Sequence, residues 1–171
     1  MTMGPIFETV GGWLEGQGIE YETRDDQSFS FTYKGSNGLW PCFVICREEE
    51  QQVLFYSVAP VAVAEASRVD VAEFILRSNY GAVLGGFEMD VDDGEVRYRT
   101  GLDVSDTKLD PTMFRNIVLM NLLMMDTYMP ALLAVLHGGV TPSVAVEKTE
   151  AGQISELMPD PDAPAETTAE A

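Results

Sequence analysis

Four carboxylates crowd one short segment of the chain, at Asp90, Asp92, Asp93 and Glu95. Carboxylates at alternate positions can bind calcium, but a calcium loop of the helix-loop-helix type also requires a glutamate at its twelfth position. The twelfth position counted from Asp90 is Gly101, so the spacing does not fit. We therefore interpret the four acids as the solvated tip of a β-hairpin, with Asp93-Gly94 at its turn.

The residues that most often serve as nucleophiles, bases and soft metal ligands are scarce. His137 is the single histidine, and it follows a predicted helix, where a partly positive side chain is favourable. Cys42 and Cys46 on one strand would lie ~13 Å apart, too far for a disulfide, and one histidine with two separated thiols is too few ligands for zinc. The sequence therefore predicts no catalytic residue, no metal and no cofactor. Buried, reduced thiols are typical of a cytoplasmic protein.

Three glycines, Gly81, Gly85 and Gly86, raise the question of a phosphate-binding loop. Both common nucleotide-binding motifs place a helix N-terminus directly after the glycines, and the phosphate loop also carries a lysine. Here no lysine follows, and a strand comes next. A helix end and a strand bulge are the interpretation that we adopt.

Arg97 and Arg99 form the most basic spot in the body of the chain, on one face of a predicted strand. They could contact an anionic ligand. They could instead pair across the hairpin with acidic neighbours, for which Glu88, Asp90 and Glu95 are available. We favour the pairing with acidic neighbours, and Arg97 and Arg99 remain candidate contacts for an anionic ligand.

Composition limits the kinds of partner. The chain has 171 residues, 46% of them apolar, and a formal net charge of -18. Residues 147–171 hold seven acids and one lysine, while residues 1–146 hold 21 acids and nine bases. A body this acidic argues against nucleic acid and against anionic membrane surfaces. We expect no signal peptide and no membrane span, one domain over residues 1–146, and a disordered acidic tail over residues 147–171.

Hydrophobic periodicity predicts the order of the elements that carry these side chains. Strands come in runs rather than alternating with helices, which favours an α+β fold with an antiparallel sheet of about five to six strands. The predicted order is α-β-β-β-β-α-β-β-α, with approximate ranges 5–15, 19–24, 28–33, 39–46, 53–59, 65–79, 83–89, 96–102 and 111–137. Pro60 should close the fourth strand, and Pro130 should kink or break the last helix near Tyr128.

Several apolar surfaces exceed what one core requires. The strands at 39–46 and 53–59 are apolar on both faces and must be covered on both, by a helix or by another subunit. The last helix is apolar almost all round, which indicates either central burial or a partner surface. The helix at 65–79 should bury the face that carries Val69, Ala72, Ile75 and Leu76. The candidate partner or dimer surface comprises Val69, Ala72, Leu76, Met120 and Met124.

Several short motifs resemble those of one protein family. They are Val71-Ala72-Glu73-Phe74-Ile75 before Arg77 and Asn79, then Gly85, Phe87-Glu88, Gly94-Glu95-Val96-Arg97-Tyr98 and Tyr128-Met129-Pro130. Over residues 5–146 the chain resembles the YbjN family, bacterial proteins described as sensory transduction regulators. That family is similar in fold to type III secretion chaperones, small α+β proteins that usually dimerise and bind partner polypeptides. The resemblance implies no catalytic residues, and it implies a dimer contact through the helix at 65–79.

These observations together predict a non-enzymatic protein-interaction module, chaperone-like or regulatory, that forms a homodimer in the cytoplasm. Its partner would be a protein rather than a nucleic acid or a membrane. The alternative is a sensor domain for a small anion, which Arg97 and Arg99 would contact.

Overall fold

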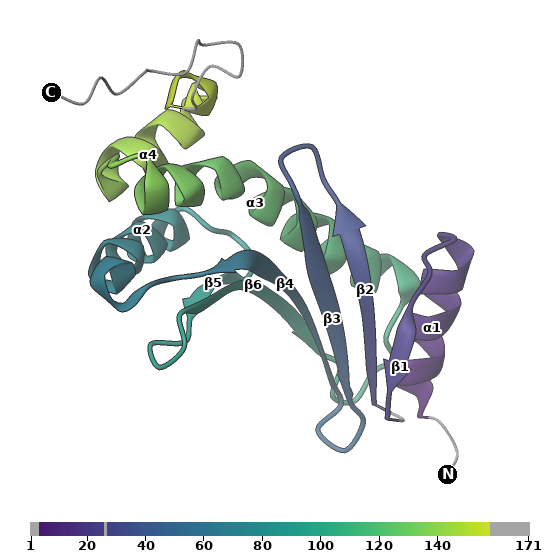
Figure 1. The fold of residues 1–171 in the computed structure, drawn as a ribbon. Helices are drawn as coiled ribbons and strands as arrows, with labels where there is room; N and C mark the ends of the chain where they lie inside the picture. Colours follow the sequence, from purple (N-terminus) through teal and green to yellow (C-terminus); the bar gives the residue numbers. More distant parts are fainter. Residues whose placement is uncertain (1–3, 26, 158–171) are drawn as a thin grey trace, which may run out of the picture.

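A single antiparallel sheet organises the molecule (Figure 1). The structure, a computed structural model, describes residues 4–25 and 27–157. The strands are β1 (Glu22–Arg24), β2 (Ser28–Lys34), β3 (Leu39–Arg47), β4 (Gln52–Ala62), β5 (Gly86–Met89) and β6 (Glu95–Asp103). The helices are α1 (Pro5–Gly16), α2 (Arg68–Tyr80), α3 (Pro111–His137) and α4 (Pro142–Glu150), with short 3-10 turns η1 (Glu65–Ser67) and η2 (Ile154–Leu157).

The six strands lie in the order β1-β2-β3-β4-β6-β5, and every neighbouring pair is antiparallel. This confirms the predicted α+β class and the predicted order of elements up to the long helix. The chain passes from β4 through α2 before β5 and β6 return as a hairpin, so β6 rather than β5 lies next to β4. The two edge strands, β1 and β5, are the shortest of the sheet.

Helices α1 and α3 pack against one face of the sheet and enclose the core (Figure 1). Alternation places every second strand residue on that face, where it is buried. The largest fully buried side chains include Trp40, Tyr98, Phe29, Phe55, Phe74 and Phe114. Phe74 of α2 contacts Phe87 of β5 and Tyr128 of α3, so α2 extends this core beyond the β5 edge.

Buried polar contacts fix α3 on the sheet. The Asn121 amide nitrogen donates to the carbonyl oxygens of Phe55 and Tyr98, on β4 and β6, at 3.0 and 2.9 Å. The Thr100 hydroxyl donates to the carbonyl oxygen of Ile117 at 3.1 Å. Because a shift of α3 along the strands would separate these buried donors from their acceptors, the contacts allow few alternative positions of the helix.

Two carboxylates attach the remaining parts of the covered side. Glu48, in the β3–β4 turn, accepts from the Phe7 backbone nitrogen at 2.8 Å and so caps the first turn of α1. Asp126 of α3 accepts from the backbone nitrogens of Ser36 and Asn37 in the β2–β3 turn, at 3.0 and 2.7 Å. Both contacts join residues far apart in the sequence.

Several predicted element bounds were wrong. The first strand covers only Glu22–Arg24, because residues 19–21 do not pair with β2. Strand β4 continues past Pro60 to Ala62, across a register shift between Val58 and Ala62 that accommodates the proline. Helix α3 is not broken near Tyr128, since it runs continuously through the buried Pro130.

The predicted orientation of the helix at 65–79 was also wrong. Helix α2 buries Val71, Phe74, Ile75 and Ser78, whereas Val69 and Leu76 are exposed. Both aliphatic sets have helical spacing. The two aromatic rings that meet Phe74 decide which set faces inward.

Ordered structure extends beyond the predicted start of the tail at residue 147. Helix α4 runs to Glu150 and buries Thr149, whose hydroxyl donates to the Ala145 carbonyl oxygen at 2.8 Å. Ile154 of η2 packs against the core. Short polar residues with buried partners give no apolar signal, which is why composition placed the boundary too early. The rest of the predicted tail, residues 158–171, lies outside the described residues.

Helix α3 has the length and apolar composition of a membrane span, and no other described helix does. In its most apolar window, 61% of the residues are buried inside the molecule. Burial of this extent is what the central helix of a folded core requires.

Candidate protein-interaction surface

The second face of the sheet carries an apolar strip that no described helix covers. Strands β3 and β4 contribute Phe43, Ile45, Leu54, Tyr56 and Val58, each half-buried by its neighbours. The register pairs Phe43 with Tyr56 and Ile45 with Leu54, so the side chains form contiguous cross-strand contacts. We call these five residues the bare-face strip. The prediction that β3 and β4 are apolar on both faces is confirmed, and one of those faces lies open.

On the β6 side of the strip, the absence of a side chain at Gly101 leaves room for the Leu54 side chain. Gly101 pairs with Leu54, and a Cβ atom built on Gly101 would lie 2.7 Å from Leu54 Cδ2. On the opposite side, β2 presents Ser28, Ser30 and Thr32 to the same face. The strip therefore has a hydroxyl-rich border along β2 and a charged border along β6.

Charge on this face differs from charge on the whole molecule. By alternation and register, five bases and four acids of the six strands point to the bare face, a net charge of +1. The bases are Arg24, Lys34, Arg47, Arg97 and Arg99, and the acids are Glu22, Glu88, Glu95 and Asp103. The full chain has a net charge of -18. Half of its ten bases thus gather on one face of the sheet.

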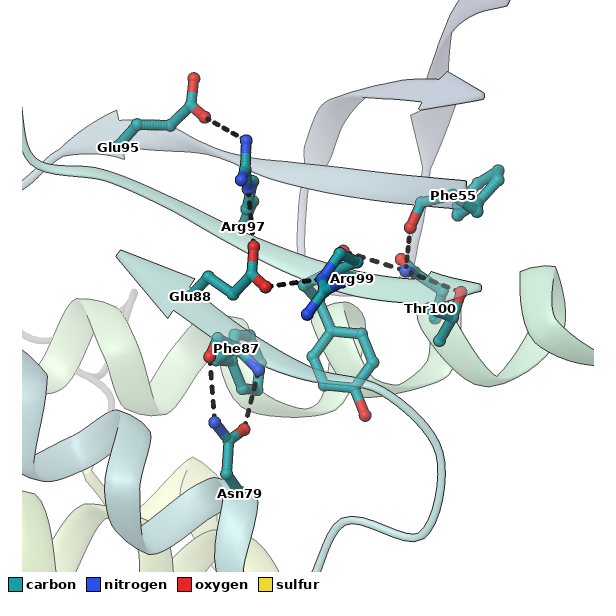
Figure 2. Close-up of polar contacts among 10 residues, drawn as sticks. Phe55, Asn79, Phe87, Glu88, Glu95, Arg97, Arg99 and Thr100 are labelled. Atoms are coloured by element: carbon teal, nitrogen blue, oxygen red, sulfur yellow. Dashed lines mark hydrogen bonds and ion pairs between the residues drawn. The ribbon is translucent and has the colours of Figure 1, made fainter. Parts of the chain in front are cut away.

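Glu88 of β5 holds both arginines of β6 (Figure 2). Its two carboxylate oxygens accept from Nε of Arg97 at 3.0 Å and from Nε of Arg99 at 2.6 Å. Arg97 also lies 3.7 Å from Glu95 and stacks over the Tyr56 ring, with its guanidinium carbon 4.7 Å from the ring centre. The predicted pairing across the hairpin is confirmed for Glu88, whereas the contact of Arg97 with Glu95 lies within β6, and Asp90 makes no ion pair with either arginine.

Two guanidinium groups beside the strip keep unused donors. Arg99 uses only Nε, and within the described chain its terminal nitrogens have no partner. The Arg24 guanidinium lies over the Phe43 ring, 5.9 Å from its centre, and makes no ion pair with any described residue. Both side chains are exposed. Five directional donors on each guanidinium make such groups natural carboxylate binders.

Asn79 of α2 closes the outer edge of β5 (Figure 2). Its amide donates to the Phe87 carbonyl oxygen at 2.9 Å and accepts from the Phe87 backbone nitrogen at 2.7 Å. The side chain thus replaces the strand that would otherwise pair there, which protects an edge from unwanted pairing. Its place in the family motif is therefore a structural one.

A second exposed apolar surface lies on the outer face of α2. Val69 is 79% exposed, Leu76 73% and Tyr80 97%. Ala72 lies half-buried between them. Large apolar side chains with this much exposure along one helix face are typical of an interaction surface. The sequence identified Val69, Ala72 and Leu76 but missed Tyr80, which continues the same stripe four residues after Leu76, because the helix was predicted to end at residue 79.

Helix α3 contributes less of its candidate surface than expected. Met120 and Met124 are each partly buried rather than fully exposed, and Met124 packs against the core. The most exposed apolar side chains of α3 are Leu119 and Leu123. The five candidates thus divide between α2 and α3, and the bare-face strip was not among them, although the two-sided apolar pattern of β3 and β4 had indicated it.

The thiols belong to the core rather than to the candidate surface. Burial raises the pKa of Cys42 and the pKa of Cys46 to about 12. Cys42 Sγ lies 3.7 Å from the Ser57 hydroxyl, within the core. Within residues 4–25 and 27–157, no three histidine, cysteine, aspartate or glutamate side chains are grouped so that they could hold a metal ion.

A single antiparallel sheet with its helices on one face and an apolar strip on the other defines a small α+β protein of the type III secretion chaperone-like fold. Residues 7–134 match the model of the family YbjN, described as "Putative bacterial sensory transduction regulator". The chain belongs to the YbjN family. Comparison with curated proteins returns no match.

Solved structures share the fold at low sequence identity. The crystal structure of YbjN from E. coli is 13% identical, with a TM-score of 0.54 over 85% of this chain and 92% of that one. The ExsC–ExsE complex gives 12% identity and a TM-score of 0.51 over 72% of this chain and 90% of that one. Identities this low establish the fold alone.

Proposed function

We propose that this chain is a non-enzymatic protein-interaction module, chaperone-like or regulatory, that acts as a cytoplasmic homodimer on a protein partner. The observation that carries the proposal is the bare-face strip. Five apolar side chains lie side by side on two central strands with no described element above them, and apolar surface of that kind is stabilised when a partner removes it from water.

The family and its structural relatives support the same class. The family is described in regulatory terms, and the fold is shared with ExsC, which was solved in a complex with ExsE. Among the described residues, no hydrogen bond or ion pair joins His137 to a carboxylate or a thiol, so no such pair supplies the division of labour that acid–base catalysis requires.

The homodimer is best supported by the outer face of α2. Val69, Leu76 and Tyr80 expose large apolar area on an element separate from the bare face. An isologous contact along this helix would bury that area in both copies at once. The bare-face strip would then remain open to the partner.

Light scattering on the full chain tests the dimer. We expect a dimer mass that Leu76→Glu converts to a monomer mass, because a charge buried in an apolar contact is unfavourable. Leu123→Glu on α3 is the matched control, and it should leave the dimer intact. A monomer at every concentration of the unaltered chain would remove the dimer from the proposal.

Affinity capture from the native cell tests the module itself. The unaltered chain should retain a protein that the variant Phe43→Ser loses, while Leu123→Ser retains it. Circular dichroism on each variant establishes that the fold is intact. If capture is the same with Phe43→Ser as with the unaltered chain, the strip is not the binding surface.

The alternative function, a sensor for a small anion, rests on Arg99. A groove of about 550 Å³ beside β5 and β6 is lined by Arg99 and by two carboxylates, Glu88 and Asp103, among others. The terminal nitrogens of Arg99 have no described partner, so they are the groups that an anion would contact there. A thermal-shift screen with anionic metabolites tests this function. Stabilisation that disappears in Arg97→Ala and Arg99→Ala would support it, and no stabilisation by any compound would exclude it.

A further inference from the structure

We propose that the bare face binds an extended polypeptide segment of another protein in which carboxylates flank apolar residues, with Arg24 and Arg99 as the carboxylate anchors. This inference rests on the proposed interaction function and adds the chemistry of the partner. The apolar residues of the segment would cover Phe43 and Tyr56, the central pair of the bare-face strip.

The placement of charge favours an acidic segment. The protein as a whole is strongly acidic, so long-range attraction would favour a basic partner. At the strip, however, the accessible charges are guanidinium groups. Arg24 has no carboxylate partner within the described chain, and Arg99 has two unused terminal nitrogens. Of the four acids of this face, Glu88 and Glu95 already contact the β6 arginines, Asp103 accepts from Gln52, and Glu22 shares the edge strand β1 with Arg24. A carboxylate that reaches Arg24 or Arg99 can accept charge-assisted hydrogen bonds from the terminal nitrogens of that arginine, which have no described partner to be displaced.

The order of residues across the sheet sets the spacing. Arg99, Tyr56, Phe43, Ser30 and Glu22 occupy one row across five neighbouring strands. Arg24, two residues along β1 from Glu22, lies over the Phe43 ring. Strands lie ~4.8 Å apart and an extended residue adds ~3.3 Å, so about eight residues span the six strands. A segment of that length can place two apolar residues on the aromatic pair and one carboxylate on each side.

Three labelled peptides provide the test. All are about eight residues long, with leucine and valine at the third and fifth positions and glutamate, glutamine or lysine at the first and seventh. These four side chains then point to the same face of the extended peptide, with the charged residues flanking the apolar pair. Fluorescence anisotropy with the full chain gives each Kd at moderate salt. We expect the glutamate peptide to bind at least about tenfold more tightly than the lysine peptide, which is opposite to the order that the net charge alone would produce.

Matched variants locate the effect. The double variant Arg24→Gln, Arg99→Gln should abolish the preference for glutamate. The double variant Lys108→Gln, Arg115→Gln removes the same charge away from the strip, and it should keep the preference. Phe43→Ser should weaken all three peptides. Circular dichroism confirms that each variant is folded.

Four results would overturn the inference. Two concern the preference: the lysine peptide binds as tightly as the glutamate peptide, or the preference for glutamate survives in the double variant Arg24→Gln, Arg99→Gln. The third is that no peptide binds. The fourth is a dimer that only Phe43→Ser dissociates, which would assign the face to a second copy of the chain. Equal binding of all three peptides that Phe43→Ser removes would leave the proposed interaction function in place while excluding the acidic partner. If affinity capture from the native cell gave the same result with Phe43→Ser as with the unaltered chain, the proposed interaction function of the bare-face strip would be contradicted instead.

Discussion

The two faces of one sheet differ in what their apolar residues do. On the covered face, Phe55 and its neighbours are sealed by α1 and α3, and the buried amide nitrogen of Asn121 donates to backbone carbonyl oxygens inside. On the bare face, equally apolar residues on the same two strands remain half-buried beside guanidinium groups. Alternation along a strand supplies both faces, but only helices that follow in the sequence decide which one becomes core. The remaining face is then available for a partner.

Removing one ring from each face should give the largest difference. Phe55 and Phe43 lie on neighbouring central strands and point to opposite faces. We expect Phe55→Ala to lower the free energy of unfolding by about 3–5 kcal/mol, because a cavity remains under α3. Phe43→Ala should cost roughly 1.5 kcal/mol or less, because its ring is only half removed from water. Urea unfolding measures both, and equal losses would show that the bare face is covered.

Thiol labelling compares the access of reagents to the two faces. Cys46 is fully buried and its pKa is raised to about 12, so neither access nor ionisation favours its reaction at neutral pH. Ile45→Cys would place a thiol one position away on the bare face. We expect the new thiol to react with a disulfide reagent at least about a hundredfold faster than Cys46, which requires core opening.

The comparison of thiols also has an opposing outcome. Protection of the thiol at position 45 in the full chain, followed by exposure on dilution, would mean that another copy of the chain covers the strip. The native Cys42 and Cys46 serve as the internal control, since both should react only as the protein unfolds.

At the outer edge of β5, removal of the Asn79 side chain should have an intermediate effect on the free energy of unfolding. Asn79→Ala would leave the Phe87 backbone nitrogen and carbonyl oxygen without their side-chain partner. We expect a loss of about 1–2 kcal/mol in the free energy of unfolding, as is usual for a part-buried pair of hydrogen bonds. Asn116→Ala, on an exposed position of α3, is the control and should be near neutral. A loss no larger than the control would contradict the role of Asn79 as the closure of the β5 edge.

Periodicity predicted the sheet and the covered face well, because burial on one side of a strand leaves a local pattern in the sequence. The two-sided pattern of β3 and β4 also predicted an extra apolar surface, and the acid-base spacing of the β5–β6 hairpin predicted the contact between Glu88 and Arg97. The face of α2 could not be predicted, because Val69 and Leu76 have the same spacing as the buried set, and only rings from β5 and α3 distinguish them. Arg24 was missed for a similar reason: its position over Phe43 depends on strand order, which a single sequence does not specify.

The smallest expected effect lies at the bare-face end of β6. Hydrogen bonds from Ser105, followed by one from Gln52, lower the pKa of the exposed Asp103 carboxyl from 3.8 to about 2. A carboxyl whose pKa is depressed in the folded state stabilises the protein fully above its unfolded pKa, and this stabilisation is lost as the pH falls from about 4 towards 2. Asp103→Asn should therefore be slightly less stable than the unaltered chain at pH 6, and the gap should close by pH 2. The measurement is the melting temperature of both proteins across that range, with Asp106→Asn as the control. A gap that stays constant with pH would show that the exposed contact of Asp103 on this face does not depend on its charge.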